Sequence, residues 1–363
     1  MRSDRKNENI DIPSLVPANV SADIFWWENV RRAELLKLFS EHIYGVTPDE
    51  LPKIEYKLSN GYCAYPDVEK TTLTIAMVRN GKSCAFRSDI YRPAGVTGHL
   101  PAVIMIDPFS KNPWYKGARC IYNHCPPDII TAAGFVAIHA HVDEACPDSK
   151  KYFNEGLLTL YPPKDESGWG AIGAWAFSAS RVIDYLLTLG DIKHDGVAVC
   201  GHSRGAKAAL WCGAQDDRAA LCISNQSGCS GAALARGKTG ERIADIVKRF
   251  PYWFCPEYKS FAGRERDLPV DQHMLLSLIA PRPLYISSAA KDSRACPKNE
   301  FKAAQLCGEI YNLYGKQGLP DIKLPKAGSS FPAGDIGYHI KKGRHSCDLS
   351  DWQHFLPFMK KYL

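Results

Sequence analysis

The pentapeptide GHSRG at residues 201–205 constrains the fold of this chain more than any other stretch. An apolar run, 196–200, precedes it, and a helix-like run, 206–211, follows it. Strand, tight turn with Ser203 at its tip and helix together form a nucleophile elbow, in which glycines let strand and helix cross closely. The alternative is a glycine-rich turn with an idle serine. The pattern predicts an α/β-hydrolase fold, a three-layer sandwich with a mostly parallel central sheet and helices on both faces.

A carboxylate and a histidine follow Ser203 in the chain order that such hydrolases use. Asp292 comes after a strong apolar run, and His345 ends the segment 337–345, which we predict to be a loop before a last helix over 351–362. A serine hydroxyl needs a histidine to take its proton, and a carboxylate to orient that histidine. We therefore expect a catalytic triad of Ser203, His345 and Asp292. An ordinary turn or helix-capping aspartate is the alternative for Asp292.

The catalytic base and the oxyanion donors have to be chosen among several candidates. His339 is the alternative base, but the Gly-Arg-His context favours His345, and we expect His273 to be structural. The backbone N–H of Arg204, directly after the nucleophile, is the expected first oxyanion donor. The loop over 107–112 should supply the second, but it lacks the glycine-rich signature of many lipases, so that donor is unassigned.

Length and composition indicate one catalytic domain over residues 1–363, with a helical segment in 1–50 packed on it. The net charge of +6 is spread along the chain without a block of like charges, so we expect no nucleic-acid partner. No stretch offers a signal-peptide core or eighteen consecutive apolar residues, so we expect no membrane association and a cytoplasmic location, or secretion if a signal was trimmed. The expected state is a monomer.

The cysteines point to a reduced protein without a metal. There are 13 of them, several lie in apolar runs, and none forms a C-x-x-C motif. We therefore expect buried thiols, no metal site and no cofactor.

Apolar periodicity predicts the remaining elements. A first helix is expected over 23–44 and another over 173–189, and the runs 71–78 and 85–91 should form a hairpin around Asn80-Gly81. Five short apolar runs are predicted as buried, mostly parallel strands: 102–106, 135–139, 197–200, 220–224 and 284–288.

Several motifs in register resemble those of the glucuronoyl esterases, also called 4-O-methyl-glucuronoyl methylesterases. They are WGAIGAW at 169–175, RVIDYL at 181–186, GHSRGAK at 201–207, NQSGCSG at 225–231, PYWF at 251–254, LPVDQH at 268–273, APRPL at 280–284 and GRH at 343–345. The resemblance covers about 161–363, and the helix that ends in Ile43-Tyr44-Gly45 extends it toward the N-terminus.

This resemblance implies a serine esterase that cleaves the ester between a glucuronic acid carboxyl on xylan and a lignin alcohol, or simple methyl glucuronates. It also implies that Arg204 helps to hold the oxyanion and that Lys207 binds sugar hydroxyls. One turn into the helix after Ser203, Lys207 can face the same cleft. A solvated helix lysine is the alternative.

The chain departs from the family at Gln226, where many members carry the catalytic glutamate. Glutamine cannot supply a carboxylate, so either Asp292 does this work or the enzyme is impaired; we favour Asp292. In the fungal members a disulfide ties the elbow to the histidine loop. Here His202 replaces that cysteine, which leaves Cys347 without that partner.

Four residues are candidates for contacts with the sugar. Gln226 and Trp253 are expected at the substrate, although Trp253 could equally anchor the core. Glu241 and Glu257 could bind sugar hydroxyls or simply be exposed; of the two, we assign Glu241 to the site.

Three functions remain open from the sequence. The first is a glucuronoyl esterase acting on small-molecule or oligosaccharide uronate esters, which Lys207 and Trp253 favour. The second is an acetylxylan-type or general carboxylesterase on the same fold. The third is a catalytically impaired carbohydrate-binding relative, which Gln226 alone favours.

Overall fold

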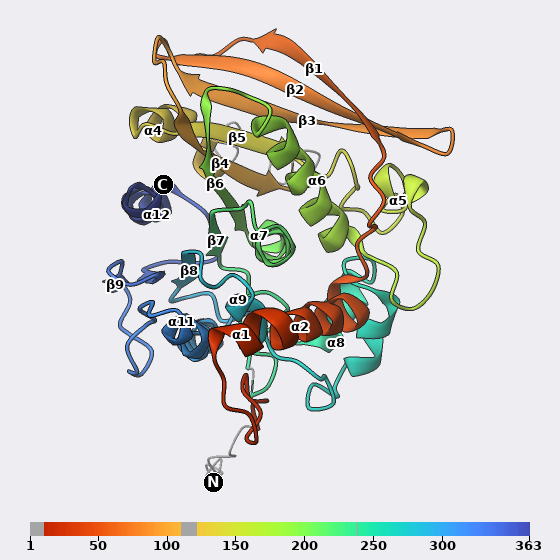
Figure 1. Cartoon of the computed structure of the whole chain (residues 1–363), viewed down its shortest axis with the longest axis vertical. Coiled ribbons are helices and arrows are strands. Elements are labelled where there is room, and N and C mark those ends of the chain that lie inside the picture. The colour runs from red at the N-terminus through yellow and green to blue at the C-terminus, as the bar shows by residue number, and fades with distance from the viewer. Residues whose placement is uncertain (1–10, 110–121, 238) are drawn as a thin grey trace.

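A ten-stranded sheet runs through the molecule in the order β1-β2-β3-β5-β4-β6-β7-β8-β10-β9 (Figure 1). The computed structural model describes residues 11–109, 122–237 and 239–363. The strands are β1 (Lys53–Gly61), β2 (Val68–Arg79), β3 (Lys82–Pro93), β4 (Leu100–Asp107), β5 (Val136–His141), β6 (Ile192–His202), β7 (Leu221–Asn225), β8 (Leu284–Ala289), β9 (Ser330–Phe331) and β10 (Ile336–Lys341).

Helices surround the sheet and carry most of the connections between its strands. The α-helices are α1 (Ile24–Trp26), α2 (Arg32–Phe39), α4 (Pro127–Ala132), α5 (Leu157–Leu160), α6 (Ala171–Leu186), α7 (Arg204–Gln215), α8 (Ile243–Arg249), α9 (Gln272–Ser277), α10 (Pro297–Leu306), α11 (Gly308–Leu313) and α12 (Leu349–Tyr362). Two π-helical turns, η1 (Trp27–Arg31) and η2 (Ser40–Tyr44), and the 3-10 helix η4 (Pro256–Phe261) complete the described helices.

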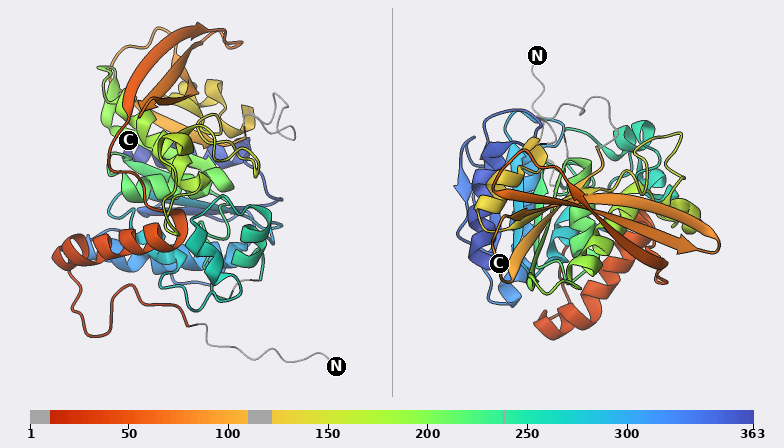
Figure 2. Two further views of the ribbon diagram at one scale, coloured as in Figure 1. Left: turned by 90° about the vertical axis from the view of Figure 1, so that its right-hand side faces the viewer. Right: turned by 90° about the horizontal axis from the view of Figure 1, so that it is seen from above.

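The centre of the sheet is parallel and its β1–β3 end is antiparallel. Strands β5, β4, β6, β7, β8 and β10 pair in parallel. Strands β1, β2 and β3 are long, pair antiparallel with one another and extend past the helices (Figure 2). Asn80 and Gly81 form the β2–β3 turn with positive φ, as the predicted hairpin requires. The predicted α/β-hydrolase fold is confirmed.

Both faces of the central strands are covered, which explains why these strands read as continuous apolar runs. Side chains of β4 alternate between two clusters: Ile104 and Ile106 pack with α6 and α7, while Val103 and Met105 pack with α4 and α12. Figure 1 shows α4 and α12 on one side of the central strands and α6 and α7 on the other.

The predicted N-terminal helix is confirmed over residues 24–44, with two π-helical turns inside it. Its last residue, Tyr44, stacks on Trp211 of α7 at a centroid distance of 4.6 Å and donates a hydrogen bond to the Ser230 carbonyl at 2.9 Å. This packing fixes the segment against the helix that follows Ser203. Apolar side chains from between Leu15 and Ile340 contribute to one shared hydrophobic cluster. That the chain forms one domain stays a prediction.

One predicted element was wrong. The segment 337–345 is not a loop throughout, because Ile336–Lys341 is strand β10, paired in parallel with β8. The loop comprises the residues between β10 and α12, whose N-cap is Asp348. In the described part of the chain, no helix has the length and apolar character needed to span a bilayer.

Candidate active site

Ser203 lies at a sharp turn between β6 and α7, with φ 56° and ψ −120°. The two flanking glycines are required there. A Cβ on Gly201 would lie 2.3 Å from the backbone of Gly205, and a Cβ on Gly205 would lie 2.4 Å from the Ile106 carbonyl oxygen. The predicted nucleophile elbow is therefore present, and its serine has a strained, positive φ.

The structure brings together the three residues predicted as a triad. His345 Nε2 lies 2.8 Å from Ser203 Oγ, and His345 Nδ1 lies 2.6 Å from Asp292 Oδ2. Asp292 is buried just beyond the end of β8, and its other oxygen accepts the Ala295 N–H at 3.1 Å. A carboxylate in this position holds Nδ1 protonated and leaves Nε2 to accept the serine proton.

The alternative base is used elsewhere. His339 is buried on β10, where its Nε2 lies 3.0 Å from Asp351 and its Nδ1 lies 3.2 Å from the Tyr285 hydroxyl. His273 is also structural, as expected, and bonds the Pro13 carbonyl through Nε2 at 3.0 Å.

A pocket of about 250 Å³ opens over the triad. Every residue assigned to the site from the sequence lines it: Ser203, Arg204, Lys207, Gln226, Glu241, Trp253, Asp292 and His345. Glu257 does not line it, and its carboxylate accepts a hydrogen bond from Ser260. Residues from five separate loops and helices thus meet at the carboxyl end of the parallel strands, as open α/β sheets require.

Arg204 forms part of the pocket wall among aromatic rings. Its guanidinium carbon lies 4.6 Å from the ring centroid of Trp253, 5.0 Å from that of Phe250 and 5.1 Å from that of Phe109. Such cation–π contacts are stabilising when they are shielded from water. Trp253 stacks flat on Phe250 at 3.8 Å, so the tryptophan both anchors the wall and faces the pocket.

Asp148 is a site residue that the sequence analysis missed. Its Oδ2 forms an ion pair with Arg204, and its Oδ1 accepts hydrogen bonds from the Tyr252 hydroxyl at 2.8 Å and from Trp253 Nε1 at 2.9 Å. Burial raises the pKa of Tyr252, so this hydroxyl keeps its proton and remains a donor. The position of Asp148 after β5, at the edge where the site forms, was the available signal.

Lys207 and Glu241 both lie at the pocket with charged or polar partners. Lys207 is buried, not solvated, and its Nζ donates to the carbonyls of Ser227 and Cys229, the latter at 2.7 Å. Glu241 pairs with Arg294 at 3.1 Å and with Arg249 at 3.7 Å. These pairs place cationic groups at the rim of the pocket.

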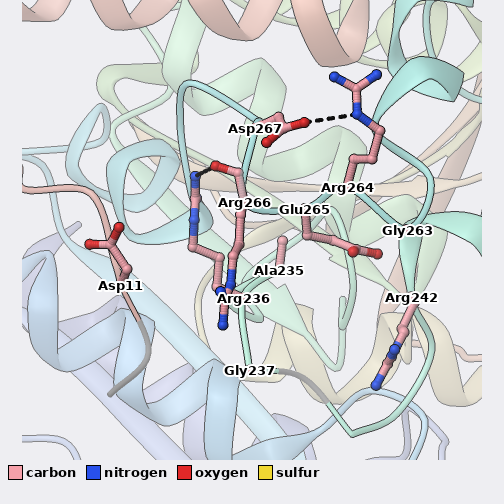
Figure 3. A pocket seen from close by; sticks show the side chains of 10 residues that line it. All are labelled: Asp11, Ala235, Arg236, Gly237, Arg242, Gly263, Arg264, Glu265, Arg266 and Asp267. Atoms are coloured by element: carbon pink, nitrogen blue, oxygen red, sulfur yellow. Dashed lines mark hydrogen bonds and ion pairs between the residues drawn. The ribbon is translucent and has the colours of Figure 1, made fainter. Parts of the chain in front are cut away.

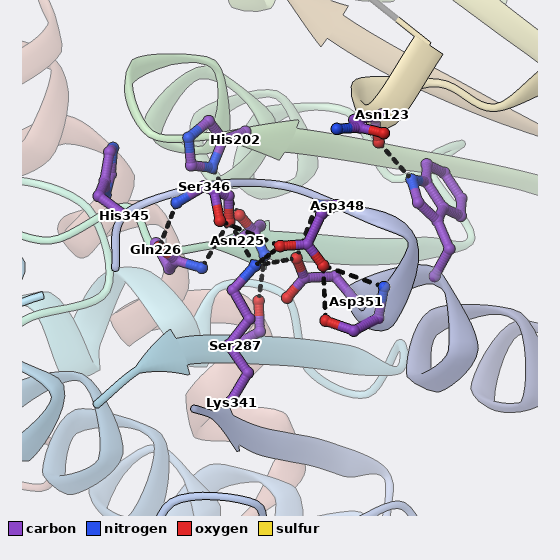
Figure 4. A network of polar contacts seen from close by, with 12 residues as sticks. Asn123, His202, Asn225, Gln226, Ser287, Lys341, His345, Ser346, Asp348 and Asp351 are labelled. Carbon is purple, nitrogen blue, oxygen red and sulfur yellow. Dashed lines mark hydrogen bonds and ion pairs between the residues drawn. The ribbon is translucent and has the colours of Figure 1, made fainter. Parts of the chain in front are cut away.

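The side chain of Gln226 bonds to the loop that carries His345 (Figure 4). Its Nε2 donates to the Ser346 carbonyl at 2.8 Å, and its Oε1 accepts the Ser346 N–H at 3.0 Å. The carboxylate partner of His345 is Asp292 instead. This geometry therefore favours Asp292 as the acid of the triad over a triad that lacks an acid.

His202 lies next to His345. Its ring centroid is 4.6 Å from that of His345, and its Nδ1 lies 2.5 Å from Asn225 Oδ1. Burial holds the pKa of His202 well below its usual range, so the ring is neutral. Within the described residues, Cys347 forms no disulfide.

Two expectations involve the loop after β4. Asp107 accepts the Phe109 N–H at 2.9 Å and holds His139 Nε2 at 2.6 Å, which anchors the start of that loop. Residues 110–112 lie outside the described residues, so the second oxyanion donor remains unassigned.

A second pocket, of about 450 Å³, is rich in arginine (Figure 3). Two of its arginines have partners within the pocket wall: Arg264 pairs with Asp267 at 2.8 Å, and Arg236 donates to the Arg266 carbonyl at 3.0 Å. It shares no lining residue with the pocket over Ser203. In the described part of the chain, no cluster of three or more His, Cys, Asp or Glu side chains is arranged to hold a metal ion.

Comparison with known proteins agrees with this geometry. A family model described as "Glucuronyl esterase, fungi" matches residues 75–315. The carbohydrate esterase MZ0003, from an unknown prokaryotic organism, is 33% identical over 369 residues, which cover 93% of this chain and 85% of that protein. A 4-O-methyl-glucuronoyl methylesterase of Podospora anserina is 28% identical over 267 residues, covering 70% of this chain and 50% of that protein.

Solved structures show the same architecture over the whole chain. A glucuronoyl esterase from Solibacter usitatus superposes with a TM-score of 0.87 at 28% identity, covering 96% of this chain and 97% of that one. A structure described as a promiscuous CE15 esterase from a marine bacterial metagenome has a TM-score of 0.85 at 30% identity, with 98% of each chain covered. With the matched family model and these relatives, the chain belongs to the glucuronoyl esterase family of carboxylic ester hydrolases.

Proposed function

We propose that this protein is a serine esterase that cleaves esters of glucuronic or 4-O-methyl-glucuronic acid in plant cell wall carbohydrate. The observation that carries the proposal is the position of His345, which bridges Ser203 at 2.8 Å and Asp292 at 2.6 Å beneath an open pocket. Family membership supplies the uronate ester as substrate class.

The proposed reaction passes through a covalent acyl-enzyme. Ser203 Oγ attacks the ester carbonyl carbon while its proton moves to His345 Nε2, and Asp292 stabilises the imidazolium through Nδ1–H. The tetrahedral intermediate collapses, the bond to the alcohol oxygen breaks, and His345 gives that oxygen its proton. Water, deprotonated by His345, then attacks the carbonyl carbon of the uronoyl-Ser203 ester. The bond to Ser203 Oγ breaks, His345 returns the proton to that oxygen, and glucuronate leaves.

Arg204 is the proposed oxyanion residue. Its backbone N–H begins α7, and its guanidinium is fixed in the pocket wall by Asp148 and three aromatic rings. Preorganised positive charge at the point where negative charge develops lowers the barrier without reorganisation during the reaction.

Lys207, Trp253 and Glu241 are the proposed contacts for the sugar. All three line the pocket, and Lys207 follows Ser203 by one helical turn. The ammonium of Lys207 can donate to a hydroxyl, and the face of Trp253 suits the apolar side of a pyranose. We further propose that the enzyme acts as a monomer without a cofactor; its cytoplasmic location also stays a prediction.

The test compares hydrolysis of benzyl glucuronate with that of p-nitrophenyl acetate. The wild type should prefer the glucuronate, and Ser203→Ala should abolish both activities. Lys207→Ala should raise KM for the glucuronate by about tenfold, the worth of one hydrogen bond from a charged group, and leave acetate turnover nearly unchanged. The control is Lys37→Ala, which removes a lysine that is 72% exposed on α2.

A second candidate function is a general carboxylesterase on the same scaffold. The 30%-identical structure described as a promiscuous esterase favours keeping it in the test. Preference for acetate, with no effect of Lys207→Ala on glucuronate turnover, would establish that alternative. The complete triad geometry speaks against a purely carbohydrate-binding relative.

A further inference from the structure

We infer that Gln226 is a positioning residue, whose side-chain amide clamps the backbone of the histidine loop and keeps the His345 imidazole between Ser203 and Asp292. The inference rests on the proposed function, because the position of His345 matters for catalysis only if His345 is the base. Gln226 stands at the position where many family members carry the catalytic glutamate. The inference assigns it a role in the reaction that is not contact with the sugar.

The clamp consists of two complementary hydrogen bonds to one residue. Gln226 Nε2 donates to the Ser346 carbonyl at 2.8 Å, and the Ser346 N–H donates to Gln226 Oε1 at 3.0 Å. A primary amide offers one donor edge and one acceptor edge, which match the C=O and N–H of a single residue. Because Ser346 directly follows His345, its N–H belongs to the peptide bond between the two residues, and the clamp fixes the backbone next to the His345 side chain (Figure 4).

The support beneath Gln226 is rigid. Gln226 is 1% exposed, and its own N–H donates to the Ser287 carbonyl of β8 at 2.9 Å. Its φ of 50° is a positive value that residues other than glycine rarely adopt, and such strained residues gather at functional sites. This turn at the end of β7 directs the side chain toward the histidine loop.

A second side chain, Lys341, anchors the same loop at the same carbonyl. Lys341 Nζ donates to the Ser346 carbonyl at 2.7 Å and pairs with Asp348 at 2.8 Å and Asp351 at 2.5 Å. Loss of the Gln226 bonds would therefore shift the loop rather than unfold it. The predicted effect is on the alignment of His345, and so on kcat, more than on stability.

A carboxylate cannot replace this amide. Glutamate at position 226 could accept the Ser346 N–H, but it would face the Ser346 carbonyl oxygen with negative charge where the amide now donates. A buried acceptor facing another acceptor costs free energy. Gln226→Glu, which restores the residue that many family members carry, should therefore lower the activity of this enzyme, whose acid is Asp292.

The experiment measures kcat, KM and the rate of Ser203 labelling by a fluorophosphonate in the wild type, Gln226→Met and Gln226→Glu. Methionine has a similar volume and cannot form the clamp. Fluorophosphonate labelling needs His345 as base and contains no sugar, so it separates positioning from sugar binding. The matched control is Gln305→Met, which removes two hydrogen bonds that the Gln305 Nε2 donates to the carbonyls of Pro320 and Ile322.

We expect both variants at position 226 to lose about tenfold in kcat and in labelling rate, with KM within about twofold of the wild type, as a small misplacement of a catalytic group predicts. Gln305→Met should match the wild type. Unchanged labelling with a raised KM would overturn the inference in favour of sugar binding, and unchanged values throughout would also overturn it. If Gln226→Met fails to fold, the near-isosteric Gln226→Glu decides. A wild type that hydrolyses neither ester would refute the proposed function itself.

Discussion

Arg204 owes its orientation to residues that lie far from it in the sequence. Its guanidinium pairs with Asp148 and lies against Trp253, Phe250 and Phe109. Asp148 in turn also holds Tyr252 and Trp253, so one carboxylate organises the pocket wall next to the nucleophile. The carboxylate of Asp148 thereby compensates the charge of Arg204, and Arg204 still lines the pocket.

Asp148→Asn should lower both activity and stability. The amide keeps the shape of the carboxylate but removes its charge, so Arg204 loses its ion pair. We expect kcat for benzyl glucuronate to fall about tenfold or more, and the free energy of unfolding to fall by about 2 kcal/mol. Enzyme kinetics and urea unfolding measure the two effects.

Asp195→Asn is the control, because Asp195 is 85% exposed and its nearest cation, Lys193 Nζ, is 3.9 Å away. It should change neither quantity measurably. Wild-type kcat and stability in Asp148→Asn would show that Arg204 needs no such support.

The triad could be predicted from the sequence because its members occur in a known chain order and two of them, Ser203 and Asp292, follow recognisable apolar runs. Ser203 has its glycines, Asp292 follows an apolar run, and His345 precedes the last helix. Asp148 also follows a strand, β5, but it lies in a long connection without a motif, and its partners come together only when the chain folds. Similarly, the pairing of Gln226 with Ser346 spans 120 residues and leaves no local pattern.

At the level of elements, the elbow depends on close contact between β6, α7 and β4. Gly205 lies in the first turn of α7, where its Cα faces the Ile106 carbonyl near the end of β4. There is no room for a side chain, because an added Cβ would lie 2.4 Å from that oxygen. The geometry of Ser203 is therefore coupled to the position of β4.

Gly205→Ala should displace the elbow. We expect a loss of about 1–3 kcal/mol in the free energy of unfolding, the usual cost of overpacking, and a loss of esterase activity larger than stability alone explains. The control is Gly190→Ala, where an added Cβ meets nothing within 4 Å. Equal activity in the two variants, measured where both are fully folded, would contradict the account.

Strand β10 shows where prediction of elements fails. Its sequence contains Gly337 and ends at Lys341, which a second lysine follows, and these features are typical of a loop. Its strand character comes from pairing with β8, with Ile336 opposite Leu284, and from the covering α12. The central strands, in contrast, are apolar enough to be recognised on their own.

Across the whole molecule, several histidines are buried in their neutral form. Burial lowers the pKa of His139, His202 and His273, the last to about 4. In the unfolded chain each has a pKa near 6.5. Between the two values the unfolded chain binds more protons, so the free energy of unfolding decreases as the pH falls below about 6.5.

His273→Gln should reduce this acid sensitivity. Glutamine does not titrate and can still donate to the Pro13 carbonyl that His273 now bonds. The wild type should lose about 2 kcal/mol more than the variant between pH 7.5 and pH 5, as follows from a folded pKa of about 4. Urea unfolding at both values of pH measures the difference. An identical loss in both proteins would mean that His273 is not kept neutral by burial.

The proposed mechanism requires Asp292 to be the acid that orients His345, and a comparison of kcat/KM for benzyl glucuronate between the wild type and Asp292→Asn tests this requirement directly. We expect Asp292→Asn to lower kcat/KM by at least about a thousandfold, because an asparagine favours the wrong imidazole tautomer. A variant that stays folded and keeps more than about a tenth of the wild-type value would show that the carboxylate of the triad comes from another residue.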